Sequence, residues 1–103
     1  MQQPRISRHA RQRLQQRGTR TREIVLVIAH ADIEIPARSG CRFLRLSHRA
    51  VASLLRQDRF AVQDVDRARR LMVLVDASDR VVTVFKCDPE QRFHGVERGW
   101  RRR

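Results

Sequence analysis

The chain has 103 residues, 41% of them hydrophobic, and its 23 Lys and Arg residues exceed its 11 Asp and Glu residues to give a formal net charge of +12. This length supports one domain with a modest core and is too short for two. No apolar run is long enough to cross a bilayer, and residues 1–5 lack the hydrophobic stretch of a secretory signal. We therefore expect a single soluble, cytoplasmic domain over residues 1–103 that does not associate with membranes.

Nearly all of the positive charge is arginine, and Lys86 is the only lysine. The guanidinium group presents a planar set of donors that fits phosphate oxygens, and a strongly basic surface attracts nucleic acid. A polyanion such as RNA is therefore the expected partner. GC-rich codon usage, or docking on an acidic partner protein, would produce the same composition.

The cysteines and histidines follow no spacing that is typical of a zinc site. They are Cys41, Cys87, His9, His30, His48 and His94. We accordingly expect neither a metal nor a cofactor, and we expect both cysteines to be reduced and half-buried on strands.

The first predicted element is a helix that begins after Ser7 and ends at Gly18. A serine hydroxyl accepts from a free first-turn amide, and glycine adopts the left-handed conformation that ends helices. Residues four apart share a helix face, so His9, Arg13 and Arg17 form one stripe, with both arginines predicted to point inward. The stripe either lines a polar cleft or edges the core with its charged ends in water.

A helix is also predicted over residues 24–31, after a threonine and an acidic first turn, although the β-branched run would suit a strand too. Residues 32–36 alternate apolar and charged side chains, which favours an edge strand that Pro36 ends. A turn over 37–40 and a second strand over 41–46 complete a predicted hairpin.

The next predicted elements are two short amphipathic helices, one over 47–57 with Ser47 as its cap and one over 61–70. The apolar run 71–75 then indicates a buried central strand, and a turn connects it to a last strand over 81–87.

On that last strand Thr83 and Lys86 point to opposite faces, since side chains alternate along a strand. Thr83 is a polar group in an apolar strand, and it is either a functional group or a β-forming residue whose hydroxyl is hydrogen-bonded.

The basic tail, about 88–103, has no clear periodicity. Its Arg101, Arg102 and Arg103 are candidates for phosphate contacts that read no sequence, although a terminal basic run is more often a solvated end. Trp100 either anchors the tail or stacks on a base.

Two motifs resemble a known group of proteins. The first is His9-Ala10-x-x-Arg13-x-x-x-Arg17-Gly18 on the opening helix, and the second is Leu74-Val75-Asp76 followed by Val81-Val82-Thr83-Val84 on the closing hairpin. Together they resemble small bacterial families allied to the RelE and BrnT toxins, within the barnase, colicin and RelE-like ribonuclease superfamily. The resemblance implies an α+β fold with two N-terminal helices packed on an antiparallel sheet of about four strands. The helices over 47–70 would be an insertion between the two hairpins.

The resemblance also implies a metal-independent endoribonuclease of the mRNA interferase type, acting on RNA such as ribosome-bound mRNA and restrained by an acidic antitoxin protein. In such chemistry the ribose 2′-hydroxyl attacks the adjacent phosphate, which requires a proton carrier and cations. His9 would carry the proton. Arg13 and Arg17 would hold the phosphate, and Lys86 or Thr83 would complete the site.

Two other classes of function stay open. The helices over 47–70 would form a helix-turn-helix in a nucleic-acid-binding module without catalysis, with Arg67, Arg69 and Arg70 near the nucleic acid. Alternatively, the chain would be a basic, phage-type inhibitor or adaptor that docks on an acidic protein or a ribonucleoprotein.

Overall fold

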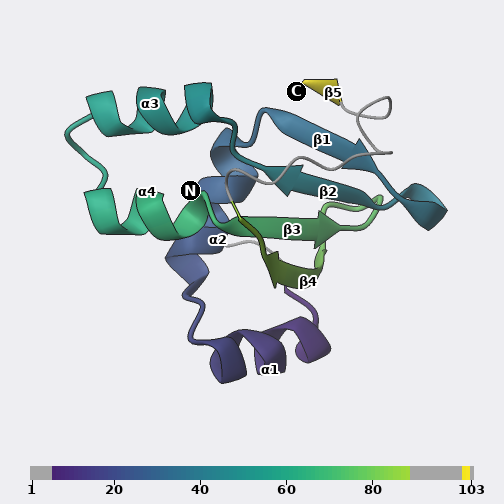
Figure 1. The fold of residues 1–103 in the computed structure, drawn as a ribbon. Coiled ribbons are helices and arrows are strands. Elements are labelled where there is room, and N and C mark those ends of the chain that lie inside the picture. Colours follow the sequence, from purple (N-terminus) through teal and green to yellow (C-terminus); the bar gives the residue numbers. More distant parts are fainter. Residues whose placement is uncertain (1–5, 89–100, 103) are drawn as a thin grey trace.

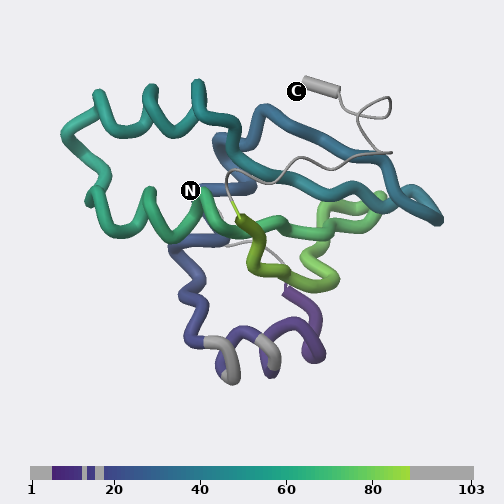
Figure 2. Tube along the Cα trace, in the orientation of Figure 1, coloured from purple at the N-terminus to yellow at the C-terminus, as the bar shows by residue number. Residues whose placement is uncertain are grey.

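The computed structural model describes residues 6–88 and 101–102. Within these ranges, only the backbone of residues 13, 16, 17, 101 and 102 is described, and not their side chains. The predictions for Trp100 and Arg103 lie outside the described residues, as do the side chains of Arg13 and Arg17. Figure 2 shows these positions in grey along the trace. Within the described part, no helix has both the length and the apolar character needed to cross a bilayer.

The order of elements is two helices, a hairpin, two helices and a second hairpin (Figure 1). The elements are α1 (Arg8–Arg17), α2 (Thr21–His30), β1 (Ile33–Pro36), the 3-10 turn η1 (Arg38–Gly40), β2 (Arg42–Arg45), α3 (His48–Arg56), α4 (Val62–Ala68), β3 (Leu71–Val75), β4 (Val81–Lys86) and β5 (Arg101–Arg102). The predicted α+β fold, with two helices before an antiparallel sheet and two between its hairpins, is confirmed.

The sheet has the strand order β4-β3-β2-β1-β5, and every neighbouring pair of strands is antiparallel. The central place of β3 was predicted from its uninterrupted apolar sequence, and four of its five residues are buried. The two-residue strand β5, which pairs with β1, was not predicted because the tail was interpreted as irregular.

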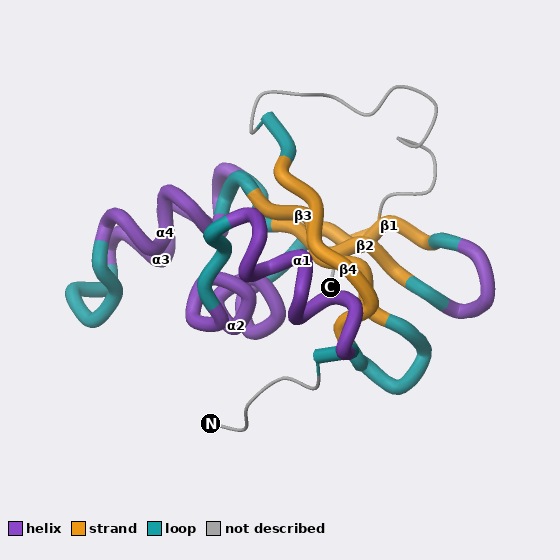
Figure 3. Tube along the Cα trace, turned by 90° about the horizontal axis from the view of Figure 1, so that it is seen from below, coloured by secondary structure: helices purple, strands orange, loops and turns teal. Residues whose placement is uncertain are grey.

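The helices α1 and α2 cover one face of the sheet, and Figure 3 shows α1 close to β4 with α2 next to α1. The helix α1 lies against β4, whereas α2 lies against β3 and β2. Apolar residues of both helices interlock with alternate residues of the strands to form one core. Its fully buried side chains include Ile24 and Val27 of α2 and Val73 and Val75 of β3.

The helices α3 and α4 lie side by side, run in opposite directions and extend beyond the ends of the strands (Figures 1 and 3). Val51 and Leu54 of α3 and Val65 and Ala68 of α4 are buried in the common core. This arrangement is an αα-hairpin, in which two antiparallel helices are joined by a short loop. The two helices predicted over residues 47–70 are thus present.

Local capping fixes where three of the helices begin. Ser7 accepts a hydrogen bond from the amide of Ala10, and Ser47 accepts one from the amide of Ala50, each over 3.1 Å. The Asp32 carboxylate in turn accepts from the backbone amide and the hydroxyl of Ser47. For α2, the Glu23 carboxylate accepts from the Arg20 amide, 3.3 Å away. Such caps satisfy amides that have no partner inside the helix.

Candidate functional site

The helix α1 runs along β4 in the same direction as the strand. At its start, the Ser7 amide donates to the Val81 carbonyl over 3.0 Å, and the Ser7 hydroxyl donates to the Val82 carbonyl over 3.3 Å. At its exit, Gly18 adopts a φ of 67°, in the left-handed region. Ten helical residues rise about 15 Å and six strand residues span roughly 20 Å, so the exit of α1 lies near the end of β4.

His9, near the start of α1, is exposed, whereas Ala10 and Leu14 provide the buried face of the helix. The backbone places Arg13 and Arg17 one and two turns beyond His9 on the same stripe. The three positions therefore extend over about 12 Å along the helix axis, following β4 from its beginning toward its end.

The two candidates on β4 face opposite sides of the sheet, as predicted. Thr83 is paired with Leu74, on the face away from α1 and α2, and its buried hydroxyl makes no hydrogen bond within residues 6–88 and 101–102. Lys86 is paired with Leu71 of the common core, on the helix-covered face. The structure thus brings Lys86, and not Thr83, to the exit of α1.

A cavity of about 370 Å³ opens at that exit, and we call it the cationic cavity. Gly18 and Thr19 form one wall, and four cations line it together with one carboxylate. The cations are Arg20, Arg67, Arg70 and Lys86, and the carboxylate belongs to Glu23. Three separate segments of the chain meet here, namely the α1–α2 junction, the end of α4 and the end of β4.

The sheet register explains why these segments meet. Because Leu71 at the start of β3 pairs with Lys86 at the end of β4, the end of α4 is brought beside Lys86. The Arg70 carbonyl accepts from the Cys87 amide over 2.7 Å and fixes this junction. The positively polarised beginning of α2 also lines the cavity and adds to its attraction for anions.

Glu23 is only 3% exposed, and one of its carboxylate oxygens lies 3.8 Å from a guanidinium nitrogen of Arg67. Asp66 stands 3.8 Å from Arg70 and 3.7 Å from Arg69, but it is about half exposed, so solvent screens these two pairs. Positive charge therefore dominates the cavity. Of the three arginines proposed from the sequence at the end of α4, Arg67 and Arg70 line this cavity and Arg69 does not.

Sequence reasoning missed Arg20 and Glu23. Their spacing of three residues at the start of a helix is the pattern of a capping interaction, and it could have been noticed. What the spacing could not reveal is that α4, about 40 residues later, packs against α2 and buries the Glu23 carboxylate.

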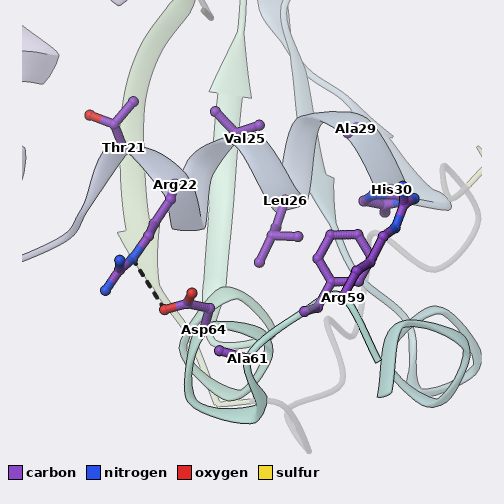
Figure 4. Close-up of a pocket in the computed structure, with 10 residues that line it drawn as sticks. Thr21, Arg22, Val25, Leu26, Ala29, His30, Arg59, Ala61 and Asp64 are labelled. Carbon is purple, nitrogen blue, oxygen red and sulfur yellow. Dashed lines mark ion pairs between the residues drawn. The ribbon is translucent and has the colours of Figure 1, made fainter. Parts of the chain in front are cut away.

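A larger cavity, of about 540 Å³, lies between α2 and the segment that joins α3 to α4 (Figure 4). We call it the α2–α4 cavity. Val25 and Leu26 form its apolar wall, with Arg22 and Asp64 at one end and His30 and Arg59 at the other. Arg22 and Asp64 form an ion pair with a separation of 3.2 Å.

The His30 and Arg59 end of this cavity is built around Phe60. The ring of Phe60 meets the His30 ring edge-on at 5.4 Å, and the Arg59 guanidinium lies over it, 4.8 Å from its centroid. Burial lowers the pKa of His30, and the nearby charge of Arg59 lowers it further, so His30 is neutral at pH 7.

Neither free cysteine lies on a strand: Cys41 precedes β2 and Cys87 follows β4, and both are partly buried. Burial raises the pKa of the Cys87 thiol. Within the described ranges, no three His, Cys, Asp or Glu side chains come together in a group that could hold a metal ion.

Comparisons with protein-family models, with curated proteins and with solved structures gave no match.

Proposed function

We propose that this protein binds single-stranded RNA and cleaves it without a metal ion. What supports the proposal is the cationic cavity, in which four basic side chains surround a hollow at the exit of α1. A phosphate of RNA would occupy the cavity, with guanidinium groups donating to its oxygens. Binding of this kind releases counterions, so affinity would fall steeply as salt rises.

The cleavage step would take place nearer the start of α1, at His9. The ribose 2′-oxygen bonds to the adjacent phosphorus, and the bond from phosphorus to the 5′-oxygen breaks, which leaves a 2′,3′-cyclic phosphate and a 5′-hydroxyl. His9 accepts the proton of the 2′-hydroxyl, and an acid returns a proton to the leaving oxygen. Arg13 and Arg17 would stabilise the charge that develops on the phosphate.

The test is incubation of single-stranded RNA with the protein in the presence of a chelator. We expect products that end in a cyclic phosphate, and we expect His9→Ala to abolish their formation. His9 is exposed, so this substitution should leave the circular dichroism spectrum and the RNA affinity unchanged. Arg8→Ala, an exposed neighbour on α1, is the matched control and should retain cleavage. Undiminished cleavage by the His9→Ala variant would contradict the proposed role.

One observation favours a second candidate, RNA binding without cleavage. A catalytic base is usually oriented by a hydrogen bond to another group, and His9 makes none within the described part of the chain. Salt-dependent binding of intact RNA, with no cyclic-phosphate products, would establish this candidate.

A cytoplasmic toxin that acts on ribosome-bound mRNA is the biological role that we propose for the nuclease, with an acidic antitoxin as its protein partner. An acidic protein would be attracted to the same basic surface that attracts RNA, and it would block access to it. Competition between RNA and a co-expressed acidic partner would test this role.

A further inference from the structure

The α2–α4 cavity is not used by the proposed chemistry, yet its size suits a ligand. Its volume of about 540 Å³ lies within the roughly 300–1,000 Å³ that is usual for small-ligand pockets. Its wall combines Val25 and Leu26 with the ring of Phe60, and its ends are polar. An apolar body with polar groups at its edge would therefore fit the lining.

This cavity is the neighbour of the cationic cavity, because the same two helices contribute to both. Arg22 and Glu23 are consecutive on α2, and each forms an ion pair with α4, to Asp64 over 3.2 Å and to Arg67 over 3.8 Å. The first pair borders the α2–α4 cavity, and the second borders the cationic cavity. Their partners Asp64 and Arg67 are about one helical turn apart on α4, roughly 5 Å along its axis, so the two hollows are neighbours.

We propose that the α2–α4 cavity receives one unstacked base of the RNA whose phosphate occupies the cationic cavity. The inference rests on the proposed function and adds to it a subsite that discriminates bases from bare backbone. Single-stranded RNA is commonly recognised in this way, with splayed bases packed on aromatic and guanidinium groups and hydrogen-bonded at their edges.

The end of the cavity near Phe60 favours a base over a purely apolar occupant. Neutral His30 offers one nitrogen that donates and one that accepts, which matches the mixed donors and acceptors of a base edge. Among the residues that the structure describes, the guanidinium of Arg59 contacts an aromatic ring and forms no ion pair with a carboxylate, so it is available to stack on or donate to a base. An alkyl chain would cover these groups without forming hydrogen bonds, which is unfavourable.

The experiment compares the affinity of the full chain for two oligomers, a single-stranded 12-nucleotide RNA and an abasic oligomer with the same number of phosphates. Fluorescence anisotropy is measured at several salt concentrations, under chelation and with His9→Ala so that cleavage does not interfere. Stacking of one base is worth about 5- to 150-fold in affinity, and we expect the His9→Ala protein, in which both cavities are intact, to prefer the RNA by such a factor.

Ala29→Phe should remove this preference, since Ala29 is an exposed residue that lines the cavity and a phenyl group there would fill it. The dependence of affinity on salt should not change. Ala52→Phe is the matched control, on the exposed side of α3 and away from both cavities, and it should retain the preference. Arg59→Ala, at another exposed position, is the second variant and should weaken the preference without filling the cavity.

The outcomes separate the two proposals. If the protein binds neither oligomer, the proposed function is overturned, and the base subsite with it. Equal binding of the two oligomers by the His9→Ala protein with both cavities intact would overturn the base subsite alone and would leave the cavity to another occupant, such as an acidic peptide. A preference that survives both Ala29→Phe and Arg59→Ala would also overturn the subsite, because the base would then be bound elsewhere.

Discussion

The cationic cavity and the α2–α4 cavity both border the helices α2 and α4, yet their linings differ in chemical character. The cationic cavity is lined mainly by the ends of charged side chains, whereas the α2–α4 cavity has an apolar wall with charges at its two ends. Neighbouring residues of α2 supply both of them. Net charge, which is a property of the whole chain, points to the first kind of site and contains no information about the second.

The largest expected effect comes from reversing charge in the cationic cavity. Arg20→Glu combined with Arg70→Glu should lower RNA affinity roughly a hundredfold, at about 1.5 kcal/mol for each lost charge-assisted hydrogen bond. The slope of log affinity against log salt should decrease by about 1.4. Arg49→Glu with Arg56→Glu changes the net charge equally on the exposed side of α3. A comparable loss in this control pair would show that the cavity has no special role.

The next effect tests whether the α2–α4 cavity depends on the capping of α3. Ser47→Ala removes the hydroxyl that caps α3 and that donates to the Asp32 carboxylate, and it should cost about 1–2 kcal/mol in the free energy of unfolding. Because the αα-hairpin forms one wall of the α2–α4 cavity, the preference for RNA over the abasic oligomer should also decrease. Chemical denaturation and anisotropy would measure the two changes, and an unchanged free energy of unfolding would show that the cap is not important.

A substitution at Glu23 is expected to raise RNA affinity, by a smaller factor than the losses above. Glu23→Gln retains an acceptor for the Arg20 amide but removes the negative charge that stands beside Arg67. Arg67 would become available to phosphate, so RNA affinity should rise severalfold and the salt slope should steepen by about 0.7. Weaker binding by a folded Glu23→Gln variant would mean instead that the carboxylate holds Arg67 in its binding position.

The smallest effect is a pH dependence of the free energy of unfolding, which arises from His30 in the α2–α4 cavity. The pKa of His30 is lowered in the folded state, so below about pH 6.5 the unfolded chain binds its proton more readily than the folded chain does. Stability from this group is therefore complete above pH 6.5 and is lost as pH falls toward the folded-state pKa. Urea denaturation at pH 7.5 and 5.5 should show a larger loss for wild type than for His30→Gln, and equal losses would contradict the assignment.

The sequence was most informative where structure depends on neighbouring residues. The hydroxyl of Ser7 and the left-handed Gly18 bound α1 as predicted, since both act within one turn of the chain. The run after Glu23 was ambiguous between helix and strand, and it is a helix because its buried residues Ile24 and Val27 recur at helical spacing on the sheet. The pairing of the two strands within each hairpin was likewise predictable, from the alternation of apolar and polar side chains and from the turn residues between the strands.

The site depends on contacts between distant segments, and local patterns do not encode these. The stripe of His9, Arg13 and Arg17 was evident, but the meeting of Lys86 with Arg67 and Arg70 requires the β3–β4 register. The burial of Glu23 requires α4 to pack on α2. The arrangement of α3 and α4 was likewise not predictable, because two short helices in sequence do not reveal the angle between them.

The N-terminal approach to α1 has a consequence for association between molecules. Beyond the paired strands, Ile6 forms a parallel bridge with Val81, and the Ser7 amide and hydroxyl donate to the carbonyls of Val81 and Val82. Exposed strand edges invite pairing with another chain, which leads to aggregation. Ile6 and Ser7 thus cover the first two residues of the outer edge of β4, and we expect a chain shortened to begin at Arg8 to expose them and to self-associate more readily.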